Sequence, residues 1–479
     1  MTSFNKYILI FLTFTFIMSC SESLPELNID PNRSTYAEPK TVLSTAQGYM
    51  GWTIDGQWNV RSAIWGQYWT WGPGVAIGNI ERYVSDGTDY DNGWVRMYTG
   101  ALADLDYVAN SESKSHAGIA KILKAYNFQL LVDHFGDIPF SEALKGGSSS
   151  VFSPNYDEDS EVYSKLIPLI DEGLADLSSG VGSEDFIYGG NVAKWNKFAN
   201  SLKLKILMRQ SNVKDVSTEV KALISSGTFI EAASDLAAIP FNGTSGSENP
   251  MYASFERSLS LFYIASNSSL LYLQETNDPR LSAFYNVAEK TGSFKGIDQG
   301  SIDNEPFTNT VEDYSRGSSY AYANDNEVIL MSPWEIWFLR AEAAARYGTS
   351  DDTESAFNNA ILASFNHLGL TSSEAADFAS TLNYGSASNS GKIALIAAQK
   401  WVSMNGLQED EGWLESRRMN TPDSPVFHDP VSGLFKKPTL STYSAGDHPS
   451  IWLYPQNEIS LNGNSPNQRT LFDRVFWDN

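Results

Sequence analysis

Apolar residues recur with a helical period along most of this chain of 479 residues. The segment 159–177 shows the pattern clearly, because Val162, Leu166, Ile170 and Leu174 follow one another at intervals of four residues. This spacing places the four side chains on one face of an α-helix. The same period predicts helices at 91–110, 119–135, 159–177, 192–208, 216–225, 332–347, 352–366, 372–382, 392–404 and 408–418. We therefore expect a mainly α-helical protein.

The predicted helices form pairs that recur at intervals of roughly 30–40 residues, a spacing typical of helical repeat proteins. The pairs are 91–110 with 115–135, 159–178 with 192–209, and 332–347 with 352–368. Small residues such as Ala341, Ala343 and Ala345 would allow paired helices to approach closely. The pattern favours tetratricopeptide-like helix pairs that form a superhelical scaffold, with an irregular helical bundle as the alternative.

One helix start is marked by consecutive residues with known positional preferences. Ser332 is expected to cap the helix, because its hydroxyl can accept a hydrogen bond from a backbone N–H of the first turn. Pro333 suits the first helical position, where no N–H is needed. Gly348 is expected to end the same helix.

Two segments, 227–330 and 419–479, lack the helical period and are rich in Gly, Ser, Asn and Pro. They contain only short apolar runs, such as the one at 327–330. Long loops on a helical scaffold usually carry function. We expect them to form a loop-rich, irregular lobe. No long linker interrupts the chain, so residues 39–479 are predicted to form a single domain.

The N-terminal segment has the pattern of an export signal that ends at a lipid attachment site. Lys6 precedes an apolar run at 8–18, which is about half the length of a membrane-spanning helix. The residues before Cys20, the only cysteine of the chain, resemble a bacterial lipobox. We expect a signal peptide at 1–19 and, at 20–38, the lipidated Cys20 and a flexible tether. A plain secretory signal with an incidental cysteine is the alternative.

Charge and cysteine content exclude several classes of protein. A formal net charge of −24 repels phosphate backbones, so the chain is not expected to bind nucleic acid. The same charge gives the body of the protein no electrostatic attraction to a membrane. A single cysteine excludes both a disulfide framework and a zinc site built from cysteines.

No catalytic motif is recognisable, and the sequence predicts no catalytic residue, metal site or cofactor. None of the five histidines has the spacing of a zinc hydrolase, and no nucleophile-elbow motif occurs. Asp86, Asp89 and Asp91, like the acidic segment 298–305, are interpreted as solvated turns, although calcium binding stays open. Paired carboxylates for glycoside hydrolysis leave no sequence pattern, so a hydrolase remains an alternative.

Aromatic residues are unevenly distributed. Residues 49–98 hold six of the 13 Trp together with five Tyr and no Phe. Trp and Tyr combine a flat apolar face with a hydrogen-bonding edge, which suits the stacking of a sugar ring. The predicted ligand platform comprises Trp65, Tyr68, Trp69, Trp71, Tyr90 and Trp94. The predicted hydrogen-bonding residues beside it are Asn59, Arg61, Gln67, Asp89 and Asn92. Packing of these rings in the core is the alternative.

Several short stretches resemble, in this order, the SusD/RagB family of nutrient-binding lipoproteins. They lie at 27–32, 125–140, 194–203, 278–280, 340–343, 413–418 and 454–462. The resemblance implies a helical scaffold with tetratricopeptide-like pairs and a partnership with a SusC-like TonB-dependent barrel. It also implies a lipid-anchored outer-membrane protein that faces the cell exterior and captures an oligosaccharide without catalysis. Alternatives are a peptide cargo, a surface glycoside hydrolase, or a scaffold without a small ligand.

Overall fold

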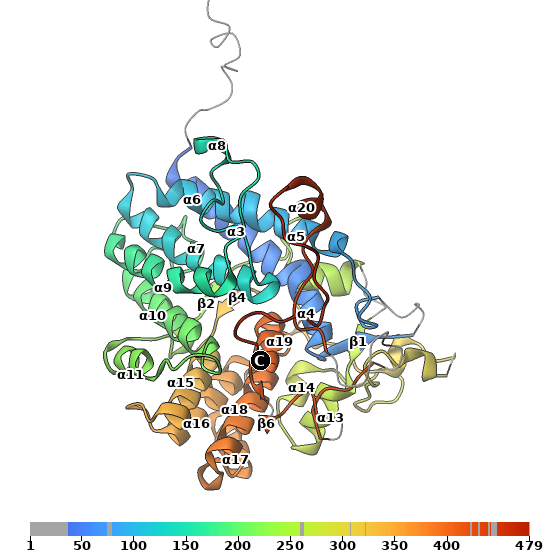
Figure 1. Cartoon of the computed structure of the whole chain (residues 1–479). Helices are drawn as coiled ribbons and strands as arrows, with labels where there is room; N and C mark the ends of the chain where they lie inside the picture. The colour runs from blue at the N-terminus through green and yellow to red at the C-terminus, as the bar shows by residue number, and fades with distance from the viewer. Residues whose placement is uncertain are drawn as a thin grey trace, which may run out of the picture. The chain divides into compact units, whose positions relative to one another are not determined.

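The computed structural model describes residues 37–73, 79–258, 263–306, 308–320, 322–421, 424–429, 432–438, 441 and 448–478. The expected signal peptide, the lipid site Cys20 and almost all of the expected tether lie outside these residues. Within them, no helix is long and apolar enough to cross a membrane. Residues Pro39–Asn479 form one compact unit (Figure 1).

Helices dominate this unit, as predicted. The first are α3 (Pro39–Thr53), α4 (Asn59–Trp65), α5 (Asp91–Val95), α6 (Ala103–Ala109), α7 (Lys114–Phe135), α8 (Gly146–Ser149), α9 (Asp159–Asp176), α10 (Val192–Arg209) and α11 (Ser217–Ser226). The later ones are α12 (Pro250–Tyr252), α13 (Asn267–Glu275), α14 (Leu281–Phe284), α15 (Pro333–Tyr347), α16 (Thr353–His367), α17 (Ser372–Thr381), α18 (Asn389–Met404), α19 (Glu409–Arg418) and α20 (Gln456–Leu461). The π-helical segments are η1 (Ile54–Trp58), η3 (Arg96–Leu102) and η5 (Ala253–Ser258). The 3₁₀ segments are η2 (Gly87–Tyr90), η4 (Ala233–Asp235), η6 (Ile302–Asn304), η7 (Val311–Asp313) and η8 (Tyr384–Ser386).

The helices pack in the predicted pairs. α6 contacts α7, α9 contacts α10, and α15 contacts α16, while α7 also lies along α9 (Figure 1). The closeness of α7 and α9 depends on two glycines. A β-carbon at Gly118 would lie 2.8 Å from the carbonyl oxygen of Gly173, and one at Gly173 would lie 2.8 Å from that of Gly118. Tetratricopeptide-like pairs therefore form the scaffold.

Local signals explain both ends of α15, and some elements differ from expectation. The Ser332 side chain accepts a hydrogen bond from the Glu335 N–H, and Gly348 ends α15 with a left-handed φ of 63°, as predicted. The helix expected at 91–110 is divided into α5, the π-helical η3 and α6. The helices α3 and α13 were not predicted, because both sequences mix apolar with many small or polar residues.

Three two-stranded antiparallel ribbons are found among the described residues, in and beside the loop-rich segments. Their strands are β1 (Trp69–Trp71), β2 (Ala237–Ile239), β3 (Tyr263–Ala265), β4 (Val328–Met331), β5 (Asn420–Thr421) and β6 (Ser424–Pro425). Strand β1 pairs with β3, so that Trp71 lies opposite Tyr263. Strand β2 pairs with β4, with Ile239 opposite Val328. The β1–β3 ribbon ties the loop-rich segment 227–330 to residues 69–71, and the β2–β4 ribbon joins the two ends of that segment.

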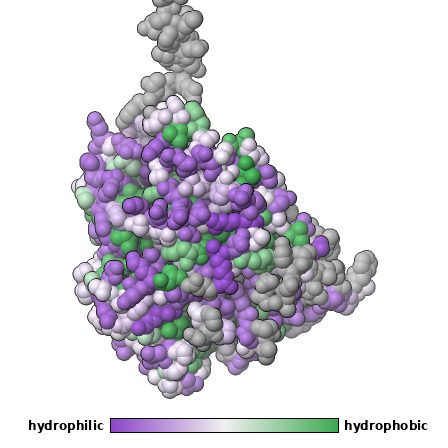
Figure 2. All heavy atoms as spheres, viewed as in Figure 1, coloured by the Kyte–Doolittle hydropathy of each residue, from purple (hydrophilic) through white to green (hydrophobic). Residues whose placement is uncertain are grey.

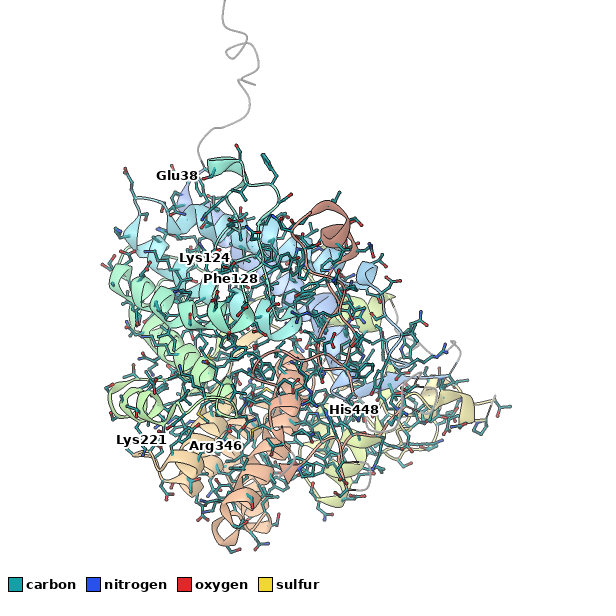
Figure 3. All side chains as sticks on the ribbon, in the orientation of Figure 1. Glu38, Lys124, Phe128, Lys221, Arg346 and His448 are labelled. Carbon is teal, nitrogen blue, oxygen red and sulfur yellow. The ribbon has the colours of Figure 1, made fainter. Side chains whose placement is uncertain are left out.

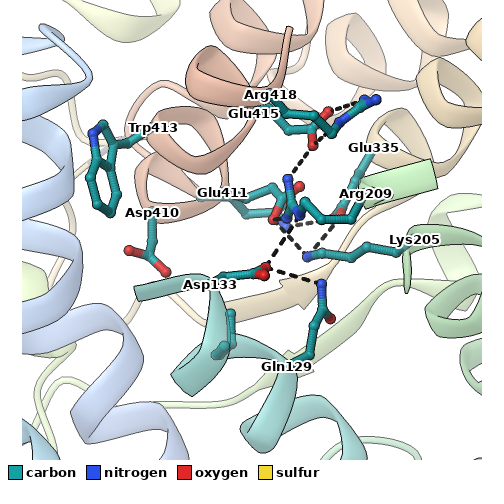
Figure 4. Close-up of polar contacts among 12 residues, drawn as sticks. Gln129, Asp133, Lys205, Arg209, Glu335, Asp410, Glu411, Trp413, Glu415 and Arg418 are labelled. Atoms are coloured by element: carbon teal, nitrogen blue, oxygen red, sulfur yellow. Dashed lines mark hydrogen bonds and ion pairs between the residues drawn. The ribbon is translucent and has the colours of Figure 1, made fainter. Parts of the chain in front are cut away.

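Helix α19 lies at the centre of the fold, and every one of its ten residues is buried (Figure 1). Its acidic and basic side chains form ion pairs with residues of α10, α15 and α18, and Arg209 of α10 extends the cluster to Asp133 of α7 (Figure 4). We call this cluster the α19 network; its members are Asp133, Lys205, Arg209, Glu335, Glu342, Lys400, Glu411, Glu415 and Arg418. Burying so many charges is tolerable only because each has an opposite partner.

The surface is mostly polar, with apolar residues gathered over α8 and α20 (Figure 2). Phe152 and Leu461 account for part of this patch, with 79% and 80% exposure. Helix α7 lies beneath this patch, and its residues Lys124 and Phe128 contact different neighbours (Figure 3). Lys124 pairs with Asp106 of α6, whereas the Phe128 ring packs against Phe140 at a centroid distance of 4.7 Å. The scaffold therefore encloses α7 on most of its circumference.

Candidate functional site

The structure buries the centre of the predicted aromatic platform. Trp65, Tyr68 and Trp69 are at most 2% exposed. Their polar edges are also occupied: Trp65 Nε1 donates to the Ile80 carbonyl at 3.0 Å, and Trp69 Nε1 donates to Glu409 at 3.0 Å. A sugar needs both an open ring face and open polar groups. As placed here, these three residues pack in the core, and their burial does not favour the predicted contact with ligand.

The other predicted rings lie apart from one another. Tyr90 is buried against Trp452, with ring centroids 5.5 Å apart. Trp71 is half-buried at the end of β1, and its ring lies 5.0 Å from that of Tyr263. Trp94 is 5% exposed and lines a separate apolar groove with neighbours that include Tyr98. The structure thus does not bring the six rings into one surface.

Most of the predicted polar residues have internal partners as well. The Arg61 guanidinium is buried over the Tyr90 ring, 4.5 Å from its centroid, and pairs with Asp89 at 3.8 Å. Gln67 is fully buried, and its Nε2 donates to the Lys436 carbonyl at 2.6 Å. Asn59 is also buried, so the structure favours a structural role for Asn59, Arg61 and Gln67 over the predicted contact with ligand. Asp89 and Asn92 are exposed, and Asp89 helps to cap η2.

An open cleft of about 380 Å³ lies between η1, the β2–β4 ribbon, Tyr320 and the segment 322–327. It is lined by Asp55, Pro240, Phe241, Asn249, Tyr320, Asp325, Asn326, Glu327, Ile329, His367, Gly406 and Leu407. We call it the acidic cleft. Its volume falls within the range of about 300–1,000 Å³ that is common for small-molecule sites. Aromatic rings and side-chain amides stand together here, which is the combination expected for a polyhydroxylated ligand.

The floor of the acidic cleft is a hydrogen-bonded layer around Asp55. Its carboxylate accepts hydrogen bonds from Asn249 Nδ2 at 2.7 Å and from Asn59 Nδ2 at 2.8 Å. Asn59 Nδ2 also donates to Glu409 at 2.8 Å, and Glu409 in turn accepts from Trp69. Two predicted residues, Asn59 and Trp69, therefore lie beneath the cleft and support its floor.

The loop 320–327 forms the rim. Tyr320 is 50% exposed, and its hydroxyl reaches Gly369 just after α16, where a β-carbon would lie only 2.6 Å from that oxygen. Asn326 Nδ2 donates to the Tyr320 carbonyl at 2.9 Å, and Asn249 Nδ2 donates to the Asn326 carbonyl at 3.2 Å. These bonds fix the loop over the floor and leave the Tyr320 ring at the opening.

His367 joins the acidic cleft to a second cavity of about 250 Å³, because it lines both. The second cavity lies beside α15 and α16 and includes Trp334, Trp337 and Asn366. The His367 ring packs on Trp334 at 4.7 Å, and no described residue hydrogen-bonds to its nitrogens. The two cavities are therefore neighbours on either side of His367, and each has aromatic rings in its lining.

The electrostatics of the acidic cleft are one-sided. Its lining includes Asp55, Asp325 and Glu327 but no Lys or Arg. Burial raises the pKa of the Asp55 carboxyl, and desolvation by the cleft walls also raises the pKa of Glu327 although that side chain is exposed. Burial lowers the pKa of His367 to about 4, so its ring is neutral at neutral pH. The lining of the acidic cleft therefore contains carboxyl groups and no Lys or Arg, and burial favours the neutral form of Asp55.

The residues of the acidic cleft were not named from the sequence, yet one signal pointed to them. Phe241, Asn249, Tyr320 and Asn326 all belong to segment 227–330, the longest interruption of the helical period. His367 lies at the end of a predicted helix, and nothing in the sequence around it indicated a binding site. Among the described residues, no cluster of His, Cys, Asp and Glu could hold a metal ion.

Comparisons with known proteins give one consistent result. A SusD-like family model, described as starch-binding and associating with the outer membrane, matches residues 31–432. A solved structure called a chitin-binding protein shares 20% identity, with a TM-score of 0.76, and the match covers 92% of this chain and 100% of that one. A SusD homolog from Bacteroides uniformis shares 21% identity at a TM-score of 0.76, covering 91% and 99% of the two chains. A chitin-binding SusD homolog from Flavobacterium johnsoniae shares 21% identity at a TM-score of 0.74, covering 91% and 97%. The search of curated proteins found no match.

Proposed function

Because this chain belongs to the SusD-like (SusD/RagB) family, whose model is described as starch-binding and associating with the outer membrane, we propose that it binds a glycan at the outer membrane and passes it to a transporter. The observation that carries the proposal is the family match over residues 31–432. The fold agrees with it, since solved SusD homologs superimpose over more than nine-tenths of the chain. The protein acts by binding and has no catalytic role.

The acidic cleft is the proposed glycan site. Tyr320 and Phe241 offer ring faces near the opening, and Asn249, Asn326 and Asp55 supply polar groups close to them. The second cavity continues the groove past His367 to Trp337, which is half-buried. An extended groove of this kind suits an oligosaccharide better than a single sugar. Trp71, which is half-buried beside Tyr263, stays a candidate for a separate contact.

The remaining parts of the proposal concern location and partner. We propose that residues 1–19 are removed, that Cys20 carries the lipid, and that residues 20–38 tether the single domain 39–479 to the outer membrane. The domain faces the cell exterior and works with a SusC-like TonB-dependent barrel. The lipobox-like residues before Cys20 and the family resemblance support these statements. Affinity need only be modest, roughly millimolar to micromolar, because the ligand must be handed on.

Titration of the mature protein with glycans and peptides tests the proposal. Maltoheptaose, N-acetylated chitin hexasaccharide and a mixed peptide library would be added in turn while calorimetry and Trp fluorescence are followed. We expect at least one glycan to bind, and Tyr320→Ala to weaken that binding about three- to tenfold, because an aromatic contact contributes about 0.5–1.5 kcal/mol. The matched control is Phe152→Ala, an exposed aromatic residue in the separate apolar groove.

Different results would contradict different parts of the proposal. Binding of peptides alone would make the cargo a peptide, and release of free sugar by the protein alone would make it a hydrolase. Glycan binding that survives Tyr320→Ala but is lost in Trp71→Ala would move the site to the end of β1. Silent titrations beside a copurifying barrel would indicate a scaffold without a small ligand.

A further inference from the structure

We propose that the second cavity, beside α15 and α16, holds the N-acetyl group of a glycan built from 2-acetamido sugars. This inference rests on the proposed function and adds to it the chemical class of the ligand. At about 250 Å³ the cavity is smaller than most sites that enclose a whole ligand, so it suits one substituted sugar unit of a longer chain. Its charge, its free hydrogen-bonding groups and its apolar wall support the assignment.

The second cavity is close to electrically neutral. Among the described residues that line it, only Glu231 and His367 can carry a charge. The Glu231 carboxylate pairs with Arg340, which also binds Asp351 at 2.5 Å. Burial lowers the pKa of His367 to about 4, so its imidazole is neutral at neutral pH. The cavity therefore provides no counter-charge for a carboxylate or an ammonium group, and either would lose hydration on entering it.

Helix α16 lines the cavity with side chains whose hydrogen-bonding groups are free. Asn359, Ala363, Asn366 and His367 recur at the spacing of one helix face. The side chains of Asn359, Asn366 and His367 form no hydrogen bond with another described residue. A neutral imidazole has one donor and one acceptor, and a side-chain amide has both kinds of group. An acetamido group, with one N–H and one carbonyl oxygen, complements them.

A buried donor in the wall of the same cavity lacks an acceptor. The Trp334 ring lines the cavity, is 1% exposed, and packs on the His367 ring at a centroid distance of 4.7 Å. Its Nε1 has no hydrogen-bond partner among the described residues. The half-buried Trp337 differs, because its Nε1 donates to the Glu231 carbonyl at 3.1 Å. An unpaired buried donor is costly, which favours a ligand that brings a carbonyl oxygen to this wall.

The rest of the wall is apolar. It consists of Ala232, Ala233, Leu236, Pro333, Leu362 and Ala363. A methyl group placed against these side chains leaves water, which is favourable. A hydroxyl group in the same place would give up hydrogen bonds to water, and these side chains could not replace them. The wall therefore distinguishes an N-acetyl group from a hydroxyl group.

Tetrasaccharides that differ only at carbon 2 of each sugar test the assignment. The mature full-length protein is titrated by calorimetry with N-acetylated chitin tetramer, its fully deacetylated counterpart and cellotetraose, which carry an acetamido, an ammonium and a hydroxyl group there. High salt is used, because the negative net charge of the protein would otherwise attract the ammonium groups. We expect the N-acetylated tetramer to bind about tenfold more tightly than cellotetraose, since it adds a methyl contact and a hydrogen bond. The deacetylated tetramer should bind no more tightly than cellotetraose.

Two variants change the cavity in different ways. Ala363→Leu places a larger side chain in it and should bring the ratio of acetamido to hydroxyl binding close to one. His367→Phe keeps a ring against Trp334 but removes both nitrogens, and it should lower the ratio from about ten to about three. Ala376→Leu, the same substitution at an exposed position of α17, is the matched control and should keep the tenfold ratio. Melting temperatures show whether each variant folds, and His367→Phe decides if Ala363→Leu does not.

The outcomes also separate this inference from the proposed function. Equal binding of the N-acetylated tetramer and cellotetraose, or a preference that survives both cavity variants, would overturn the acetamido assignment while glycan binding stands. An N-acetylated alanine tripeptide that binds more tightly than the N-acetylated tetramer, and fails to bind Ala363→Leu, would overturn it in favour of a peptide. If no glycan of this set or of the wider panel bound, the proposed function would fail and the assignment with it.

Discussion

Carboxyl groups have cations beside them in the α19 network but not in the acidic cleft. In the network, neighbouring Arg and Lys side chains lower the pKa of Glu342, Glu411 and Glu415 in spite of their burial. In the cleft, Asp55 and Glu327 have no cation beside them, and desolvation raises the pKa of both. Asp133 is the exception within the network, because its burial outweighs the effect of Arg209.

The contrast teaches where this protein tolerates uncompensated charge. Within the α19 network each carboxylate has a cation, and the geometry is close: Lys205 Nζ lies 2.7 Å from Glu411, and Arg418 lies 2.6 Å from Glu342. Such a network adds little stability over an apolar core, but losing one partner leaves a buried charge alone. The following predictions test this difference, from the largest effect to the smallest.

Removing one cation of the α19 network should have the largest effect. Arg209 pairs with Asp133 at 3.2 Å, with Glu411 at 2.7 Å and also with Glu415, so Arg209→Met leaves three buried carboxylates with weaker compensation. We expect the free energy of unfolding to fall by about 3–5 kcal/mol. Urea denaturation followed by circular dichroism measures it.

A surface ion pair is the control for Arg209→Met. Lys290 pairs with Asp313 at 3.0 Å, but its side chain is 48% exposed. Lys290→Ala should change stability by less than about 1 kcal/mol, because solvent screens exposed pairs. A loss of similar size in both variants would mean that burial does not distinguish the α19 network from the surface.

The second prediction separates the two kinds of aromatic residue. Trp69 is 1% exposed within the core, so Trp69→Ala should cost about 3–5 kcal/mol of stability through the cavity it leaves. Tyr320, at the rim of the acidic cleft, is 50% exposed, and Tyr320→Ala should cost far less while it weakens glycan binding. Thermal melts of both variants, with wild-type protein alongside, provide the measurement. A stable Trp69→Ala protein with lost binding would restore Trp69 as a ligand residue.

The scaffold could be predicted from the sequence because its signals are local. Helix period, the Ser332 cap and the stop at Gly348 depend on residues within one or two turns, and the structure confirms each of them. The sequence could not show that α3 is a helix, since its apolar residues are interrupted by small and polar ones. Nor could it show that helix α19, with its many charges, is wholly buried, because its partners come from distant helices.

The candidate site was less predictable for the same reason. The number of aromatic residues within 49–98 showed how much ring surface the fold must accommodate. It could not show which of these rings would stay accessible to a ligand. Trp69 reaches Glu409, 340 residues further along the chain, and that contact decides its role. The acidic cleft combines η1, the loop 320–327 and the end of α16, which no spacing rule connects. Only the loop-rich composition of 227–330 indicated part of it.

A third prediction concerns Glu81, a fully buried carboxyl that has no cation, like those of the cleft. Its Oε1 accepts hydrogen bonds from the Trp71 N–H at 3.0 Å and from Gln299 Nε2 at 3.0 Å, so it ties β1 to a loop. Burial raises its pKa from the ordinary 4.5 to about 7. Between these values the folded state holds a proton that the unfolded state releases. Stability should therefore fall as pH rises through this window, by about 3 kcal/mol from this group.

Glu81→Gln tests that pH dependence directly. A neutral amide can keep the acceptor on Oε1, while the second oxygen of Glu81 has no partner to lose. Urea denaturation at pH 4 and pH 8 should show the variant gaining about 3 kcal/mol on the wild type between the two values. Glu289→Gln, an exposed site, should show no such gain. Parallel pH profiles for Glu81→Gln and the wild type would contradict the prediction.

The smallest expected effect on stability has opposite signs in the acidic cleft and in the α19 network when a Glu is replaced by Gln. Glu327 has a raised pKa, so its ionised form is disfavoured in the folded protein at neutral pH, and Glu327→Gln should slightly stabilise the fold. Because the side chain is exposed, the gain should stay below about 0.5 kcal/mol. It should vanish as pH falls far enough to protonate Glu327 in the wild type.

Glu411→Gln should instead destabilise the fold, since its carboxylate pairs with Lys205, Arg209 and Lys400. Paired urea titrations at neutral pH resolve the two signs, and a loss of stability in Glu327→Gln would show that this carboxylate is compensated within the protein.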